Sequence, residues 1–284
     1  MTSYSYFKSS DGLRLAYRIG GSGPPLLCLA GLSRHSAEFD YIRQRLHGVT
    51  YICPDYRGRG RSDWDRNPDN YVAPIEARDA VELLDHLGIA STPILGTSRG
   101  GIIAALLAGV TASRVSGVIL NDIGPKLEID GLDRIGSFIG RRPSVGSLAE
   151  AAERMPEYRQ GFADVPASRW LEEVERNYLE RQGRLKLRYD PELRQQFMLA
   201  VESGQLEMWD LFDSLKDLPF LLLRGNGSDL LSERTASQMQ ERWPHMEHCE
   251  VPGRGHCPFL DEPESLEAIA SFLRNVGHAD CNIS

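Results

Sequence analysis

The chain has 284 residues, of which 41% are hydrophobic, so it can bury a substantial core in one large α/β domain with room for an insertion. The formal net charge of -8 argues against a nucleic-acid-binding surface, and no run of Lys or Arg suggests a phosphate-binding patch. The five cysteines are odd in number and include no CxxC pair, which disfavours both a disulfide framework and a zinc site.

The N-terminal twenty residues contain no continuous apolar region followed by a small-residue cleavage site, so no signal peptide is predicted. No apolar stretch approaches the roughly 20 residues that a membrane-spanning helix needs. We therefore expect a cytoplasmic protein that acts on a small molecule, without a membrane or nucleic-acid partner. The oligomeric state is open between a monomer and a homodimer.

The first half of the chain alternates predicted strands and helices. A hairpin is expected around Asp11-Gly12, because an Asp-Gly pair suits a two-residue hairpin turn. Apolar runs predict buried strands, and helical spacing predicts helices between them. The strands are expected at 24–31, 50–54, 92–96 and 115–121, and the helices at 36–48, at 75–89 and from residue 98.

The pattern changes after about Pro125. Residues 126–218 are predicted to be mainly helical, with the clearest pieces at 167–182 and 190–215. The strand rhythm then resumes, with strands at 219–225 and 247–251 and helices at 233–243 and 264–277. The alternation predicts an α/β fold with a mostly parallel sheet and helices on both faces. Residues 1–124 and 219–284 would form this core, and residues 125–218 would be a helical insertion.

Ser98 lies in Gly96-Thr97-Ser98-Arg99-Gly100, which fits G-x-S-x-G between a predicted strand and a predicted helix. A sharp strand-to-helix turn of this kind exposes the serine hydroxyl at the helix N-terminus, and glycines are needed where a Cβ would clash. A Gly/Ser turn without chemistry is the alternative. The strand and helix on either side favour a nucleophile.

A serine nucleophile needs a base and an acid that orients the base. His256 stands in a Gly-rich turn directly after the last predicted strand, in "VPGRGHCPFLDEPE". Asp229 follows the strand "FLLLRG" in "NGSDLLS". The chain order Ser98, Asp229, His256 favours a triad of these three residues.

Together these motifs resemble the α/β-hydrolase family, and the resemblance covers nearly the whole chain. "GTSRGG" resembles the nucleophile elbow, "LRGNGSDLLS" the acid loop and "PGRGHCPFLDEPE" the histidine loop. In "PDYRGRGRSD", which resembles a loop of the family, Asp55 and Arg57 would be structural. The resemblance implies that the insertion is a cap over the active site. Asp122 is a rival acid, because some family members place their acid at the end of the sixth strand; Asp229 is preferred.

The resemblance also implies an oxyanion hole made by the backbone N–H groups of Leu32 and Arg99. The Arg99 side chain is expected to form a structural ion pair, with recognition of an anionic substrate as the alternative. Cys257 is discounted as a second nucleophile. Candidates for the substrate pocket are His35, Trp64, Phe138 and Trp209, and Trp170, Phe197 and Met208 are further apolar candidates.

The expected reaction is hydrolysis of a carboxylic ester of a small to medium apolar substrate through an acyl-enzyme, without a metal or organic cofactor. The alternatives are hydrolysis of a carbon–carbon bond in a ring-cleavage product, hydrolysis of a lactone or thioester, and, more remotely, a non-catalytic ligand receptor. The fold alone does not choose among them, since it supports many chemistries.

Overall fold

The computed structural model describes residues 3–204 and 206–284. Within these residues, eight strands form one sheet in the order β1-β2-β5-β3-β6-β7-β10-β11. β1, β2 and β5 pair antiparallel at one edge, and the strands from β5 to β11 run parallel. The strands are β1 (Tyr4–Lys8), β2 (Arg14–Gly21), β3 (Pro25–Leu29), β5 (Thr50–Pro54), β6 (Thr92–Thr97), β7 (Val115–Asn121), β10 (Phe220–Gly225) and β11 (Glu247–Val251). The predicted mostly parallel α/β sheet is confirmed.

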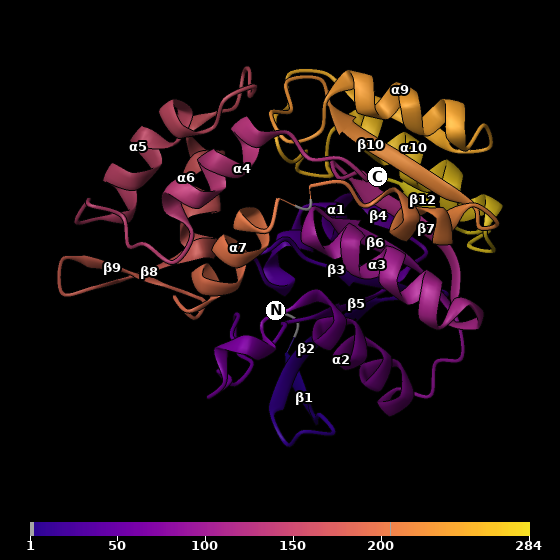
Figure 1. The fold of residues 1–284 in the computed structure, drawn as a ribbon, viewed down its shortest axis with the longest axis horizontal. Helices are drawn as coiled ribbons and strands as arrows, with labels where there is room; N and C mark the ends of the chain where they lie inside the picture. The colour runs from indigo at the N-terminus through magenta and orange to yellow at the C-terminus, as the bar shows by residue number, and fades with distance from the viewer. Residues whose placement is uncertain (1–2, 205) are drawn as a thin grey trace.

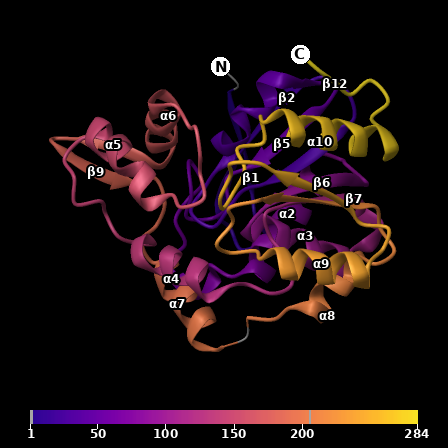
Figure 2. The same cartoon turned by 90° about the horizontal axis from the view of Figure 1, so that it is seen from above.

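Helices cover both faces of the sheet, with α10 on one side and α2, α3 and α9 on the other (Figures 1 and 2). Their bounds are α2 (Ala73–His86), α3 (Arg99–Val110), α9 (Glu233–Arg242) and α10 (Pro263–Asn275). Because both faces are covered, central strands are apolar throughout rather than alternating. Every residue of β6 and of β10 is buried, which explains why continuous apolar runs predicted these strands correctly.

The segment predicted as a helix at 36–48 is broken into shorter pieces. It forms a 3-10 helix, η1 (Ser36–Asp40), and one turn of α-helix, α1 (Ile42–Arg45). The chain then leaves the helix because β4 (Leu46–His47) pairs with β12 (Asn282–Ile283) at the other end of the sequence. A pairing over this sequence distance leaves no local signal.

The insertion between β7 and β10 extends from one end of the sheet (Figure 1). Its elements are α4 (Ile129–Phe138), α5 (Leu148–Tyr158), α6 (Ala167–Asn177), β8 (Tyr178–Arg181), β9 (Arg184–Leu187), α7 (Leu193–Glu202), α8 (Trp209–Phe212) and the 3-10 helix η4 (Asp213–Leu215). Residue 205, inside the helix predicted at 190–215, lies outside the described residues. That the insertion acts as a cap over the active site stays a prediction.

The helix predicted at 167–182 is wrong at its C-terminal end. It stops at Asn177, and the chain continues as the β8–β9 hairpin. Gln182 and Gly183 form the turn with φ values of 55° and 66°, the left-handed conformation that a tight hairpin requires. Gln is uncommon in this conformation, so the sequence contained only a weak turn signal.

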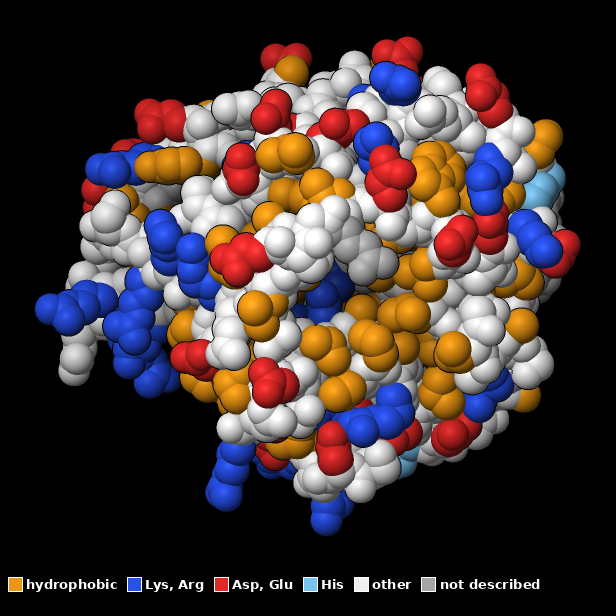
Figure 3. Space-filling view, in the orientation of Figure 1, with side chains coloured by type: hydrophobic (Ala, Val, Ile, Leu, Met, Phe, Trp, Pro, Cys, Tyr) orange, Lys and Arg blue, Asp and Glu red, His pale blue; other side chains and the backbone are white. Residues whose placement is uncertain are grey.

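Lys and Arg side chains gather over the outer end of the insertion, at the left of Figure 3, although the chain as a whole is acidic. Within residues 3–204 and 206–284, no helix has the length and apolar character needed to cross a membrane.

Candidate active site

Ser98 occupies the turn between β6 and α3 with φ 51° and ψ -115°, a conformation that non-glycine residues rarely adopt. The glycines around it allow the turn. A Cβ on Gly96 would lie 2.5 Å from the carbonyl carbon of Gly100, and a Cβ on Gly100 would lie 1.9 Å from the backbone oxygen of Leu29. The predicted strand–turn–helix is therefore confirmed as a strained turn that displays the Ser98 side chain.

His256 lies in the loop after β11 and contacts the serine directly. Its Nε2 is 2.9 Å from Oγ of Ser98. The residue is 6% exposed, so bulk water has little access to the imidazole. The backbone oxygen of His256 accepts a hydrogen bond of 3.0 Å from Arg159, at the end of α5 in the insertion. Ser98 and His256 are thus brought together as the sequence predicted.

Asp122, at the end of β7, is the carboxylate that contacts His256. Its Oδ2 lies 2.7 Å from Nδ1 of the imidazole and accepts a hydrogen bond of 2.6 Å from the hydroxyl of Ser228. Its Oδ1 accepts a hydrogen bond of 2.9 Å from the backbone N–H of Gly225. The carboxylate is fully buried, and these three contacts with Ser228, Gly225 and His256 replace the water it loses.

The placement of Asp229 corrects the sequence prediction. Its carboxylate forms a bidentate ion pair with the guanidinium of Arg134 in α4, and no hydrogen bond joins it to His256 among the described residues. Burial opposes ionisation of this carboxyl, but the hydrogen bonds and charge of Arg134 outweigh it and lower the pKa of Asp229. Asp229 therefore links the core to the insertion.

The topology explains why Asp122 reaches the histidine. β7 lies between β6, which leads into Ser98, and β10, which leads into the predicted acid loop. Asp122 has φ 56°, so the chain turns sharply after β7 and directs the carboxylate along the edge of the sheet.

The backbone N–H groups of Leu32 and Arg99 are the predicted donors of the oxyanion hole. Leu32 lines the same cavity as Ser98. Among the described residues, neither N–H donates a backbone hydrogen bond outside regular structure, so both are free to bind an oxyanion. Their role stays a prediction.

The Arg99 side chain forms an ion pair of 2.5 Å with Glu76 and donates to the backbone oxygen of Tyr71. Glu76 is fully buried and also forms an ion pair of 2.7 Å with Arg59. Burial opposes ionisation of Glu76, but the charges of Arg59 and Arg99 lower its pKa. The guanidinium of Arg99 thus has a structural ion pair and does not line the cavity.

The loop after β5 is held as the resemblance implied. Asp55 accepts hydrogen bonds of 2.8 Å from the backbone N–H groups of Ser36 and Arg61. The buried guanidinium of Arg57 donates to Asp79 at 2.7 Å and to Asp65 at 2.6 Å.

A cavity of about 410 Å³ opens above Ser98, between the core and the insertion. Part of its wall is apolar and includes Phe138, Phe162 and Phe259, and the rings of Phe162 and Phe259 pack with their centroids 5.3 Å apart. Phe138 was a predicted pocket residue, and its contact with substrate stays a prediction. Among the further candidates, Trp170 packs behind this wall against Phe162, with ring centroids 5.5 Å apart.

Three other predicted pocket residues lie elsewhere. His35 is buried and its Nε2 is 2.8 Å from the backbone oxygen of Arg176, so it joins the loop after β3 to α6. Trp64 is 52% exposed outside the cavity. Trp209 packs against Trp243, with ring centroids 5.9 Å apart. Large aromatic side chains are conspicuous in a sequence, but tertiary packing decides where they lie. Phe197 and Met208 likewise pack against the core rather than line the cavity.

A sequence model of the alpha/beta hydrolase family matches residues 26–269, most of the chain. The chain belongs to the alpha/beta hydrolase family. Among relatives in this family, a 3-hydroxybutyrate-oligomer hydrolase of Cupriavidus necator is 32% identical over 272 residues, which is 92% of each chain. A 2-(acetamidomethylene)succinate hydrolase of Mesorhizobium japonicum is 28% identical over 267 residues, again 92% of each chain.

Solved structures share this fold. The crystal structure of an alpha/beta hydrolase from Novosphingobium aromaticivorans has a TM-score of 0.87 and 36% identity, and the alignment covers 96% of this chain and 99% of that one. A 2-(acetamidomethylene)succinate hydrolase structure has a TM-score of 0.79 at 24% identity, which shows the shared fold.

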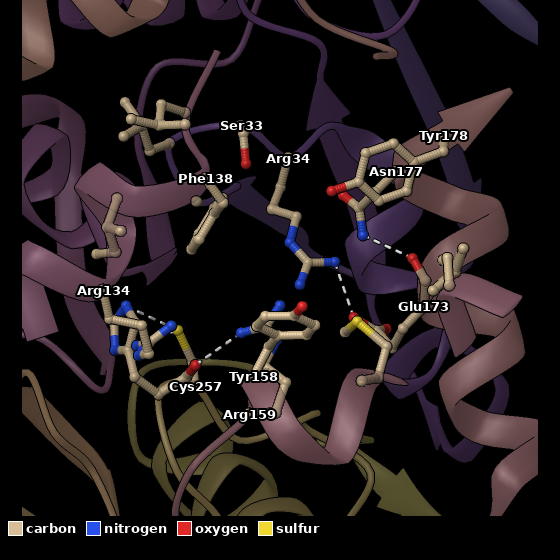
Figure 4. Close-up of a pocket in the computed structure, with 18 of the residues that line it drawn as sticks. Ser33, Arg34, Arg134, Phe138, Tyr158, Arg159, Glu173, Asn177, Tyr178 and Cys257 are labelled. Atoms are coloured by element: carbon tan, nitrogen blue, oxygen red, sulfur yellow. Dashed lines mark hydrogen bonds and ion pairs between the residues drawn. The ribbon is translucent and has the colours of Figure 1, made fainter. Parts of the chain in front are cut away.

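The sequence analysis missed the charged side chains that this alpha/beta hydrolase places in its cavity. Figure 4 shows Arg34 and Arg159 pointing toward each other from opposite walls, with Glu173 beside Arg34. Glu38 and Arg134 also line the cavity. Charged residues on amphipathic helices usually face water, so no sequence signal separated these from the rest. Among the described residues, no group of three His, Cys, Asp or Glu side chains is placed to hold a metal ion.

Proposed function

We propose that the protein is a serine hydrolase that cleaves a carboxylic ester of a small molecule through an acyl-enzyme, with Ser98 as nucleophile, His256 as base and Asp122 as the orienting acid. The observation that carries the proposal is the chain of contacts from Ser98 Oγ to His256 Nε2 at 2.9 Å and from His256 Nδ1 to Asp122 Oδ2 at 2.7 Å. These separations suit proton transfer at one imidazole nitrogen while the other is held.

In the first step, Nε2 of His256 takes the proton of the Ser98 hydroxyl as Oγ attacks the ester carbonyl carbon. The Asp122 carboxylate accepts the Nδ1–H hydrogen bond, fixes the tautomer with Nε2 free, and stabilises the imidazolium that forms. The backbone N–H groups of Leu32 and Arg99 are the proposed donors to the oxyanion. His256 then gives the proton to the leaving alcohol oxygen, and the C–O bond breaks.

In the second step, a water molecule attacks the acyl-enzyme carbonyl. His256 takes a proton from this water and returns it to Ser98 Oγ, which releases the carboxylic acid. The low exposure of His256 supports this role, because a dry site strengthens the charge interactions on which both steps depend.

The relatives support ester hydrolysis as the first candidate. The relative from Cupriavidus necator is named for oligomers of 3-hydroxybutyrate, whose units are joined by carboxylic esters. That protein aligns over 92% of this chain. We infer a small oxygen ester as substrate, with the insertion acting as the cap that selects it.

The test is hydrolysis of 4-nitrophenyl esters of increasing acyl length by the wild-type protein and by the Ser98→Ala variant. We expect the wild type to release 4-nitrophenol and the variant to be at background. Turnover by the variant close to that of the wild type would contradict the proposed nucleophile. A wild type that leaves every ester intact would remove ester hydrolysis from the proposal.

A second candidate is hydrolysis of a carbon–carbon bond in a ring-cleavage product, which can use the same three residues. The arginines in the cavity wall favour it, because such substrates are dienoates with a negative charge. Loss of the dienoate absorbance in the presence of the wild type, but not of Ser98→Ala, would support it over ester hydrolysis if the esters are inert.

A further inference from the structure

Six arginines of the described residues line the cavity, of which Arg141, Arg142 and Arg154 are exposed to solvent. The three less exposed ones, Arg34, Arg134 and Arg159, differ in how their charges are paired. Arg34 forms an ion pair of 2.8 Å with Glu173, and Arg134 is paired with Asp229. Both cations are thus compensated by a carboxylate. A ligand anion would have to compete with these carboxylates for Arg34 and Arg134.

Arg159 differs from the other two. Among residues 3–204 and 206–284, its guanidinium donates one hydrogen bond, to the backbone oxygen of His256, a neutral acceptor, and no carboxylate there forms an ion pair with it. Burial, together with the positive charges of Arg34 and Arg134, lowers its pKa to about 10. A guanidinium has five N–H donors in a planar fork, so most of the Arg159 donors have no protein partner.

Among the described residues that line the cavity, the one carboxyl besides Glu173 is that of Glu38, which accepts a hydrogen bond of 2.9 Å from the backbone N–H of Gly31. Burial raises the pKa of Glu38 to about 7, so near neutral pH a large fraction of this carboxyl is protonated. Within the described part of the chain, the Arg159 guanidinium therefore has no paired carboxylate, whereas Arg34 and Arg134 each have one.

The position of Arg159 is fixed by close backbone packing. The two residues that follow it lie against the catalytic loops, where the chains approach so closely that only glycine fits. A Cβ on Gly255 would lie 2.2 Å from the backbone oxygen of Gln160, and a Cβ on Gly227 would lie 2.6 Å from the Cα of Gly161. This packing holds the backbone beside Arg159, and the hydrogen bond to His256 restrains its guanidinium, so less freedom is lost when it binds a ligand.

We propose that Arg159 binds a carboxylate of the substrate, and that the substrates are esters with a free carboxylate a few bonds from the cleaved carbonyl. The guanidinium of Arg159 contacts the backbone of His256 and lines the same cavity as Ser98, so an anion bound to it would lie in the cavity that holds the reacting groups. A planar guanidinium matches a carboxylate with two parallel hydrogen bonds. The claim that the bound molecule is a cleaved ester rests on the proposed function. The claim that Arg159 binds a carboxylate rests on the geometry of the cavity.

The first test compares esters that differ only by the carboxylate. 4-Nitrophenyl hemisuccinate and 4-nitrophenyl butyrate place a carboxylate or a methyl group at the same point of the acyl chain. 3-Acetoxybutyrate and sec-butyl acetate do the same on the alcohol side. We expect the wild type to have at least about tenfold higher kcat/KM for the charged ester of one pair, because a charge-assisted bidentate contact is worth at least that factor.

In the Arg159→Gln variant, this ratio of charged to neutral ester should fall by about tenfold or more. The ratio cancels any loss that affects both esters through the His256 loop. Arg181→Gln is the matched control, since it removes the same charge from the exposed β8–β9 hairpin outside the cavity, and its ratio should equal that of the wild type. Equal rates for both esters of each pair, or an unchanged ratio in Arg159→Gln, would overturn the proposal.

The second test needs no turnover, so it separates failure of this site from failure of ester hydrolysis. Calorimetric titration with butyrate and with its neutral isostere butyramide measures carboxylate binding directly. We expect butyrate to bind the wild type, butyramide to bind at least about tenfold more weakly, and Arg159→Gln to lose the difference. Equal binding of the two probes, or a difference that persists in Arg159→Gln, would overturn the carboxylate site even if esters are hydrolysed.

Discussion

The hydroxyl of Ser228 donates a hydrogen bond of 2.6 Å to Oδ2 of Asp122, the same oxygen that lies 2.7 Å from Nδ1 of His256. The loop after β10 therefore supports the carboxylate beside the histidine without supplying it. Asp229, the next residue in that loop, turns to the insertion and pairs with Arg134. One loop thus stabilises both the buried carboxylate and the contact between core and insertion.

The different contacts of the two aspartates predict losses of very different size for the same substitution. Asp122→Asn should lower kcat by about 10⁴-fold, because an amide at this position favours the wrong histidine tautomer. Asp229→Asn should lower kcat by less than about tenfold, since it loses only the charge opposite Arg134. Steady-state kinetics on one ester measures both. A larger loss in Asp229→Asn would contradict the assignment of Asp122 and identify Asp229 as the acid that orients His256.

The Ser98→Ala variant should lose at least about 10³-fold in kcat while it keeps the fold, because only the hydroxyl is removed. Its strained φ of 51° is retained by alanine, so little change in stability is expected. Circular dichroism and thermal unfolding provide the control. Loss of activity together with loss of the folded signal would leave the nucleophile to be tested by Ser98→Cys.

The sequence identified the parts of the fold that local patterns determine. Apolar runs predicted β3, β6, β7 and β10, and the G-x-S-x-G pattern predicted the turn at Ser98. It did not predict the β8–β9 hairpin, because the turn relies on Gln182 in a conformation that other residues usually supply. Nor did it predict β4, whose partner strand lies at the opposite end of the chain.

The site was predicted in part for a similar reason. Ser98 and His256 stand in loops with recognisable glycines, whereas Asp122 and Asp229 each follow an apolar strand, and the family resemblance favoured Asp229 over Asp122. Their difference arises because Arg134 pairs with Asp229 while Ser228 donates to Asp122, and the residues of each pair meet only in the folded chain. The charge pattern of the cavity depends in the same way on pairs such as Arg34 with Glu173, which are far apart in sequence.

The buried carboxylate of Glu76 should contribute strongly to the free energy of unfolding. Glu76→Gln would leave the guanidinium groups of Arg59 and Arg99 without their shared counter-ion, and breaking a buried ion pair typically costs about 3–5 kcal/mol. Asp85→Asn is the control, since its side chain is 61% exposed and its pair with Arg114 should contribute less than about 1 kcal/mol. Urea denaturation measures both, and equal losses would contradict the structural role of Glu76.

The buried carboxyl of Glu38 should make the free energy of unfolding depend on pH. Burial raises its pKa from 4.5 to about 7, so between these pH values the native state holds a proton that the unfolded state releases. Its contribution to the free energy of unfolding is therefore present at low pH and is lost as the pH rises through this window. Glu38→Gln removes that contribution, while its amide oxygen can still accept the hydrogen bond from Gly31.

The measurement is the difference in unfolding free energy between pH 5 and pH 8. Glu38→Gln should lose less stability over this interval than the wild type. Glu157→Gln, on the exposed face of α5, should follow the wild type. Identical losses in Glu38→Gln and the wild type would show that the Glu38 carboxyl titrates as it does in the unfolded chain.

The proposed nucleophile can be tested most directly by mass spectrometry after reaction with a fluorophosphonate, which phosphonylates activated serines and releases fluoride. The account predicts one adduct on the peptide that contains Ser98, strongly reduced labelling in Asp122→Asn, and none in Ser98→Ala. A protein that stays unlabelled, or whose adduct lies on another residue such as Cys257, would contradict the assignment of Ser98, His256 and Asp122 as the reacting groups.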